Sequence, residues 1–193
     1  MSDVTTETKK DRRIQRTEKA LRNALAELLL EKDLRSITVR ELAERADIHR
    51  GTFYAHYQDL YELFEQIENE VFKELASILV FNPGHDYTQI FTVLFDYAEE
   101  NADSFRILYS NSTVNYFPLR LSDFITERAI AITLADENMT SDEMPGRWKL
   151  LLRYSVAGLL SIFESWIQSD FTEDKGELVR FSIEVDNHMD KLF

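Results

Sequence analysis

Apolar residues recur at three- and four-residue spacing along nearly the whole chain, which is the pattern of amphipathic α-helices. No segment shows the alternation of apolar and polar positions that is typical of a β-strand. Five Gly and three Pro in 193 residues leave little room for turns, which favours long helices. We therefore predict an all-α protein of about nine helices. After a disordered start at residues 1–8, the expected helices cover residues 11–31, 39–46, from 50, 60–82, 87–101, 103–109, 116–136, 145–168 and from 173 onward.

Residues 36–57 have the length of two short helices joined by a tight turn. Thr38 followed by Glu41 is a capping box, which predicts that the first of these helices starts at residue 39. Asp47 interrupts the apolar pattern, and a short polar side chain tolerates the left-handed conformation of a turn. In the second helix Phe53 and Tyr57 are four residues apart, so both should pack inward.

The remaining positions of that second helix should face outward. They offer a cation, a glycine, hydroxyl groups and an imidazole, which suit a groove lined by phosphates. The pair of helices is therefore a candidate DNA reader, although most short helix–turn–helix pairs in all-α proteins do not touch DNA. The outward positions are Arg50, Gly51, Thr52, Tyr54, Ala55 and His56.

The distribution of charge divides the chain at about the same place. Residues 1–57 hold 12 Lys+Arg and 10 Asp+Glu, for a net charge of +2, whereas residues 58–193 hold 10 and 25, for −15. Duplex DNA would repel the acidic part, so only the N-terminal end could approach it. We expect a basic arm and DNA-binding domain at 1–57 and an acidic helical domain at 58–193. The basic side chains before the motif are Lys9, Lys10, Arg12, Arg13, Arg16, Lys19 and Arg22.

The stretch ITVRELAERADIHRGTFYAHYQDLYELF resembles the DNA-binding signature of the TetR family of bacterial one-component regulators, with an AcrR-type helix–turn–helix. Together with residues 16–30 as the first helix, the resemblance covers roughly the first third of the chain. FDYAEENADSFRILYSN and GLLSIFESWIQ resemble a C-terminal domain found in one branch of that family. The residues that fit the signature are Ile37, Thr38, Leu42, Ala43, Ala46, Ile48, Gly51, Thr52, Phe53, Tyr54, His56, Tyr57 and Leu63.

The chain departs from the family pattern at three positions of the motif. Asp47 stands in the turn where the family usually has Gly, and His49 stands at the helix cap where it usually has Ser. A neutral His can accept the capping hydrogen bond, although it is not a preferred cap. Leu60 replaces a Lys that often contacts phosphate.

The resemblance implies that each subunit of a homodimer inserts the second helix of the motif into the major groove of double-stranded DNA. Arg50 would read guanine with two hydrogen bonds, and Gly51 would allow close backbone approach. Phosphate contacts, which set the position on the duplex, would come from Thr38, Arg40, Thr52, Tyr54 and His56. The expected function is a repressor that a small-molecule effector releases from a palindromic operator.

Two further sites are expected in the acidic part. Residues 146–168 are apolar nearly all round and should be buried on most sides, against the next helix and a second subunit. The expected dimer interface is Leu159, Phe163, Trp166, Leu178, Phe181 and Val185. An effector cavity, of a kind that family members often enclose between their middle helices, would involve Phe91, Phe95, Tyr109, Arg120, Phe124, Arg128, Tyr154 and Phe163.

Other functions find little support in the residues. The chain has no Cys, and its four His lack the spacing of metal ligands, so we expect no metal, no cofactor and no catalytic site. The charged first 30 residues and the lack of an uninterrupted apolar run of roughly 20 residues predict a cytoplasmic protein with no membrane partner. Two alternatives stay open: a regulator gated by a protein partner or not gated, and an acidic helical interaction module that does not bind DNA.

Overall fold

The computed structural model describes residues 3–80, 88–110 and 116–189, and the regular secondary structure of these residues is helical, with no strand among them. The all-α prediction is therefore confirmed. The helices are α1 (Asp3–Glu31), α2 (Val39–Arg45), α3 (Arg50–Tyr54), α4 (Leu60–Ile78), α5 (Thr88–Glu100), α6 (Ala102–Leu108), α7 (Phe117–Asp136), α8 (Gly146–Gln168) and α9 (Lys175–Met189), with a 3₁₀ turn at Leu34–Ser36.

Most helix boundaries lie within a few residues of those expected, and two features differ. Helix α1 begins at Asp3, so the prediction of a disordered start is wrong for residues 3–8, and residues 1 and 2 lie outside the described residues. Pro145 is the residue before α8 rather than part of its first turn. The expected end of the fourth helix at residue 82 lies outside the described residues.

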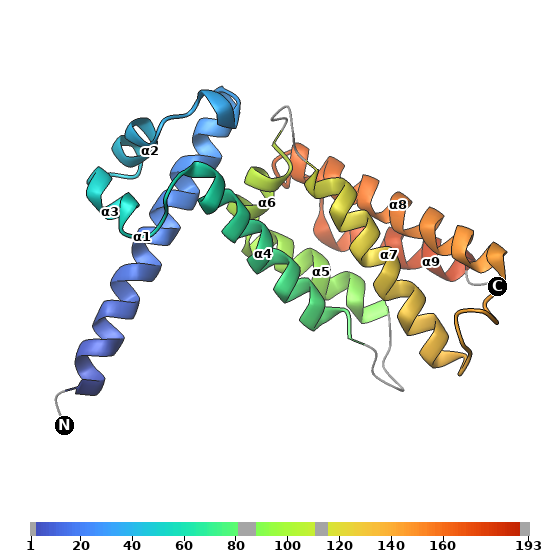
Figure 1. Cartoon of the computed structure of the whole chain (residues 1–193). Helices are drawn as coiled ribbons and strands as arrows, with labels where there is room; N and C mark the ends of the chain where they lie inside the picture. Colours follow the sequence, from blue (N-terminus) through green and yellow to red (C-terminus); the bar gives the residue numbers. More distant parts are fainter. Residues whose placement is uncertain (1–2, 81–87, 111–115, 190–193) are drawn as a thin grey trace.

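Helices α2 and α3 pack against one side of α1, and the N-terminal part of α1 projects beyond them (Figure 1). Apolar residues of α1 face the two short helices because they recur at helical spacing. Leu21, Leu25, Leu42 and Phe53 have no exposed surface, and Tyr57 is 2% exposed. This small core holds α3 in place at one end of the molecule.

Helices α4 to α9 form a bundle beside the first three helices (Figure 1). The short α6 packs against α1, α4 and α8, so it joins the two parts of the molecule. The bundle core is rich in aromatic rings, and Phe95 contacts both Phe163 and Trp166 at centroid distances of 5.4 and 5.2 Å. Aromatic side chains bury large apolar areas, which stabilises a bundle of this size.

The expectation that α8 is buried on most sides is not met within one chain. Only Val156, Phe163, Trp166 and Ile167 of this helix are buried, and Tyr154 is 71% exposed. By length and composition alone, α8 is long and apolar enough to cross a membrane. Within the chain, 22% of its most apolar window is buried. Its apolar character therefore exceeds what the packing of one chain uses.

Candidate DNA-binding interface and ligand cavity

Helix α2 begins with the predicted capping box. The Glu41 N–H donates to Thr38 Oγ1 at 3.2 Å, and the Thr38 N–H donates to Glu41 Oε2 at 2.9 Å. Lys32 Nζ donates to the other carboxylate oxygen at 2.6 Å. Hydrogen bonds from Lys32 and Thr38 lower the pKa of Glu41 to about 2, so the cap is ionised at neutral pH.

The turn between α2 and α3 depends on Asp47, which has a φ of 52°. The prediction of a left-handed residue at this position is confirmed. The next N–H, of Ile48, donates to the Ala43 carbonyl at 3.0 Å, which is the hydrogen bond of a Schellman motif. The motif ends α2 sharply and turns the chain into α3.

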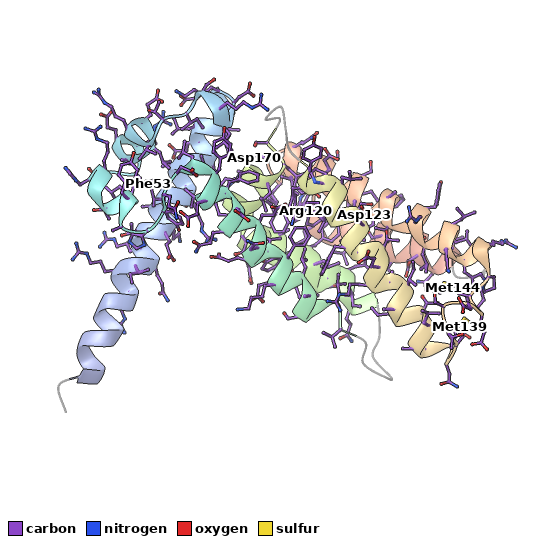
Figure 2. All side chains as sticks on the ribbon, in the orientation of Figure 1. Phe53, Arg120, Asp123, Met139, Met144 and Asp170 are labelled. Atoms are coloured by element: carbon purple, nitrogen blue, oxygen red, sulfur yellow. The ribbon has the colours of Figure 1, made fainter. Side chains whose placement is uncertain are left out.

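Helix α3 is capped by His49, whose Nδ1 accepts a hydrogen bond from the Gly51 N–H at 3.1 Å. The expectation that a neutral His can serve as this cap is therefore confirmed. Phe53 and Tyr57 point into the core, as their spacing predicted, and their ring centroids lie 5.6 Å apart. Figure 2 shows Phe53 enclosed by the first three helices. This packing leaves the opposite side of α3 to solvent.

That solvent-facing side carries the side chains that were expected to contact DNA. Arg50 and Tyr54 are exposed, whereas Thr52 and His56 are half-buried. Arg50 has no ion-pair partner among the described side chains, so its guanidinium is available for a ligand. Two of the expected phosphate-binding residues are already engaged. The Thr38 hydroxyl donates to Glu41 at 2.8 Å, and Arg40 Nε pairs with Glu44 at 2.8 Å.

The basic side chains of α1 fall into two groups. Arg12, Arg13, Arg16 and Lys19 are exposed and have no ion-pair partner among the described side chains. Arg22 instead pairs with Glu70 of α4 and donates to the Ser104 hydroxyl at 3.5 Å. It therefore holds α1 against α4 and α6 and does not extend the basic surface. The side chains of Lys9 and Lys10 lie outside the described part of the structure.

A cavity of about 880 Å³ lies between α5, α7, α8 and α9. This volume is within the usual range for small-molecule sites. The walls are mainly aliphatic and aromatic, and three carboxylates line the cavity as well. The lining side chains include Phe91, Ala129, Asp136, Glu137, Trp148, Tyr154, Phe181, Val185 and Asp186.

Comparisons with known proteins agree with this arrangement. The sequence profile of the bacterial regulatory proteins of the tetR family matches residues 21–67, and a profile described as a transcriptional regulator C-terminal region, also of the TetR type, matches residues 85–185. The second match alone covers more than half of the chain. The chain belongs to the TetR family. It is a DNA-binding transcriptional regulator and not an enzyme.

Individual relatives of this TetR-family protein are distant. An uncharacterized HTH-type transcriptional regulator of Bacillus subtilis strain 168, YxbF, is 40% identical over 62 residues, which are 32% of this chain and 16% of that protein. A tetR-family regulator from Streptomyces coelicolor has a TM-score of 0.62 at 18% identity, covering 89% of this chain and 81% of that one. The dihydroxyacetone kinase operon activator DhaS has a TM-score of 0.57 at 20% identity, covering 90% and 93%. At these identities the structures support the fold alone.

The cavity between α5, α7, α8 and α9 includes only two of the residues that were expected in it. Phe91 and Tyr154 line it, whereas Phe95, Tyr109 and Phe163 are buried in the aromatic core. Burial raises the pKa of the Tyr109 hydroxyl above its ordinary value.

The other expected cavity residues lie elsewhere on the bundle. Arg120, labelled on α7 in Figure 2, pairs with the buried Glu68 of α4 at 2.8 Å. Burial raises the pKa of that carboxyl although Arg120 opposes the shift. The Arg128 guanidinium lies 5.3 Å from the ring centroid of Phe124, and neither residue lines the cavity.

The residues of the expected dimer interface also fall into two groups, those that are at least partly exposed and those that are buried within one chain. Phe181 and Val185 are exposed on α9, and Leu159 and Leu178 are half-buried. Phe163 and Trp166 are 7% and 1% exposed within one chain, so they have almost no surface left for a partner. We therefore do not include these two residues in the proposed interface.

Sequence reasoning missed most of the cavity walls. From the sequence, the aliphatic side chains of α7 are not singled out, and those of α8 are expected against the next helix and a second subunit, because helical spacing does not distinguish a packed position from a cavity wall. Asp136, Glu137 and Asp186 were passed over because acidic residues are abundant throughout residues 58–193. The feature that distinguishes these three carboxylates is their position near the ends of α7 and α9.

Proposed function

We propose that this regulator acts as a homodimer that binds a palindromic operator through two α3 helices. The observation that carries the DNA-reading part is Arg50, which is exposed at the first position of α3 and has no ion-pair partner among the described side chains. A guanidinium placed there can form two hydrogen bonds with guanine O6 and N7. Gly51, the next residue, has no side chain to hinder close approach of the α3 backbone.

The exposed cations of α1 support phosphate binding near α3. Arg12, Arg13, Arg16 and Lys19 would neutralise the duplex backbone, and the negative charge of residues 58–193 would keep the rest of the molecule away from it. We place the division between a DNA-binding domain and an effector and dimerisation domain at residues 57 and 58, just before α4. We also propose that the protein acts in the cytoplasm, where its operator would lie.

The exposed apolar surface of α8 and α9 supports dimerisation through these two helices. Tyr154 and Phe181 are 71% and 52% exposed, which is a large apolar area to leave in water. At Gly158, in the middle of α8, an added Cβ would meet no atom within 4 Å, so packing within the chain does not require a glycine there. A close crossing of two α8 helices would require one.

The cavity supports small-molecule control over the alternative of a protein partner or no gating. A space of about 880 Å³ with mostly apolar walls has the size and the lining of small-molecule sites. We propose that an effector filling it shifts α4, changes the spacing of the two α3 helices and releases the operator. Repression is the proposed sign. Because DhaS is named as an activator, a promoter fusion must decide the sign for this chain.

Arg50→Ala tests the proposed reading of bases. The variant should bind a selected operator with a free energy that is less favourable by about 1–3 kcal/mol, and its preference at one base pair of each half-site should be relaxed. Arg147→Ala removes the same charge from an exposed position at the start of α8 and should leave binding unchanged. Fluorescence anisotropy with the operator and its single-base variants measures both.

The outcome separates two roles for Arg50. If Arg50→Ala weakens all sequences equally, the side chain only contacts phosphate. Arg12→Ala and Arg16→Ala should each flatten the dependence of affinity on salt by close to one unit of slope, because one phosphate contact is lost. Unchanged slopes would place α1 away from the duplex.

A further inference from the structure

We propose that Arg106 of α6 is a positioning residue for DNA binding, because it ties the turn between α8 and α9 to a helix that packs against α1. This turn spans residues 169–174. By holding it, Arg106 fixes the first three helices in one orientation relative to α8 and α9. The effect expected on a full operator rests on the homodimer proposed above, whereas the effect within one chain does not.

The turn between α8 and α9 has an unusual backbone. Asp170 and Phe171 have φ values of 62° and 59°. The Phe171 N–H donates to the Trp166 carbonyl at 2.9 Å, so a Schellman motif ends α8. A short polar Asp tolerates the left-handed conformation, but a bulky residue at positive φ is strained and persists only where its surroundings hold it. The side-chain contacts of Asp170 and Phe171 therefore decide whether the turn keeps this shape.

Arg106 contacts both of these left-handed residues. Its Nε donates to Asp170 Oδ1 at 2.8 Å, and its Nη2 lies 2.8 Å from the same oxygen. Its guanidinium carbon lies 5.3 Å from the ring centroid of Phe171, which also packs on Trp166 at a centroid distance of 4.8 Å. A guanidinium can combine an ion pair with stacking on an aromatic ring, so one side chain holds the whole turn. Figure 2 shows Asp170 at the end of the bundle next to the first three helices.

The same part of α6 is connected to α1. Arg106 Nη1 donates to Asp103 Oδ1 at 2.8 Å. In the amide orientation that satisfies its neighbours, the Asn23 side chain of α1 donates to the other oxygen of Asp103 at 2.7 Å. Arg22 of α1 donates to the Ser104 hydroxyl at 3.5 Å. A continuous series of polar contacts thus runs from α1 through α6 to the turn that joins α8 and α9.

These contacts orient helices more than they stabilise the fold. The side chains of Arg106 and Asp170 are 29% and 73% exposed, and ion pairs exposed to this extent contribute little to stability. A dimer that reads two half-sites, however, needs its two α3 helices at a set separation, and freedom in their orientation raises the entropic cost of binding both. Loss of the Arg106 contacts should therefore weaken binding of a full operator and leave binding of a single half-site unchanged.

Distance measurements within one chain test the proposal without DNA, an effector or a dimer. The chain has no Cys, so Ala55→Cys at the C-cap of α3 and Glu127→Cys on α7 introduce two spin labels at exposed positions. An excess of unlabelled protein keeps the labels of different chains apart. Pulsed electron paramagnetic resonance should give a narrow distance distribution for the labelled parent protein. Arg106→Gln and Asp170→Asn, which each remove the ion pair, should broaden or displace that distribution.

Matched variants define the result. Arg147→Gln and Asp142→Asn make the same chemical changes at exposed positions and should leave the distance distribution as it is in the parent. Arg106→Lys keeps the charge and should restore much of the narrow distribution. Asp170→Asn keeps a residue that tolerates positive φ, so it removes the ion pair without a change of backbone preference. An unchanged distribution in both Arg106→Gln and Asp170→Asn, or equal broadening in the two controls, would overturn the proposal.

Fluorescence anisotropy on DNA tests the consequence for operator binding. Arg106→Gln should bind a full operator about fivefold or more weakly, and it should tolerate a wider range of half-site spacings. Its affinity for a single half-site should equal that of the parent protein. Equal weakening on the half-site and on the full operator would indicate a purely structural role and overturn the positioning role.

The two proposals can fail independently. If the parent protein itself does not prefer a full operator to a half-site, the homodimer on a palindrome fails, and the distance distributions still decide the role of Arg106. If the parent prefers the full operator and Arg106→Gln binds it with unchanged affinity and spacing preference, the homodimer stands and the positioning role fails.

Discussion

The first three helices and the α4–α9 bundle bury their apolar side chains to different extents. In the first part Leu21, Leu25, Leu42 and Phe53 have no exposed surface, and the residues left outside are largely charged or polar. In the second part Tyr154 and Phe181 are largely exposed, and both line the cavity of about 880 Å³. The small core of the DNA-binding part is thus packed within one chain, whereas α8 and α9 of the bundle leave several apolar side chains exposed.

This difference indicates how the two parts depend on their partners. A fully packed small core keeps the exposed side chains of α3 at fixed positions before DNA arrives, which lowers the entropic cost of binding. The bundle has a surface and a cavity whose occupation can change its packing, which is what control by a ligand requires.

The largest effect is expected from the small core. Phe53→Ala should destabilise the first three helices by about 3–5 kcal/mol, because a completely buried ring is replaced by a cavity. Operator binding should be lost. Chemical denaturation followed by circular dichroism, together with anisotropy on DNA, measures both effects. Tyr54→Ala, at the exposed neighbouring position, should leave stability nearly unchanged. Similar losses of stability in the two variants would contradict the described packing.

The next largest effect is expected at the exposed face of the bundle. Phe181→Asp would place an unpaired charge in the proposed interface and should weaken the dimer by roughly 3 kcal/mol or more. Analytical ultracentrifugation should then show a folded monomer that does not occupy a full operator. Leu30→Asp changes another exposed apolar residue, on α1, and should leave the dimer intact. A dimer of normal affinity in the Phe181→Asp variant would place the interface elsewhere.

A substitution at Gly158 separates packing within one chain from packing between two subunits. Within one chain, Gly158→Ala should stabilise α8 by about 0.5–1 kcal/mol, because an added Cβ meets nothing within 4 Å. If two α8 helices cross there, the same methyl group should weaken the dimer. Gly146→Ala is the control, because it adds a methyl group to open space at the start of α8. Thermal melts at several protein concentrations separate the two effects, and an unaffected dimer would move the crossing away from residue 158.

The smallest effect is expected at Tyr57, whose buried hydroxyl has no hydrogen-bond partner among the described residues. Burial raises the pKa of this hydroxyl to about 12, so it stays neutral. Tyr57→Phe should leave stability unchanged or raise it by about 1 kcal/mol, because an unsatisfied polar group is removed from the core. Tyr61→Phe, at an exposed position, should have no effect. A loss of stability in urea denaturation of Tyr57→Phe would show that the hydroxyl does have a partner.

The local features of the first three helices follow directly from the amino-acid sequence. The capping box at Thr38, the left-handed turn at Asp47 and the inward positions of Phe53 and Tyr57 were all predictable. Each of them depends on interactions between residues at most four apart, or on the direction that helical spacing gives to a side chain. The family signature lies in this same segment, so the DNA-binding function was predictable as well.

Whether a residue of the bundle faces a cavity, the core or the solvent depends on how the helices pack together. Phe163 and Trp166 pack inside one chain, and Arg22 and Arg120 pair with carboxylates of α4 that are 48 and 52 residues away along the chain. A cavity is the space that remains after several helices have packed, so it depends on their rotations and crossing angles. Helical periodicity specifies that a side chain points inward, but the neighbouring helices determine whether it meets another side chain or an open space.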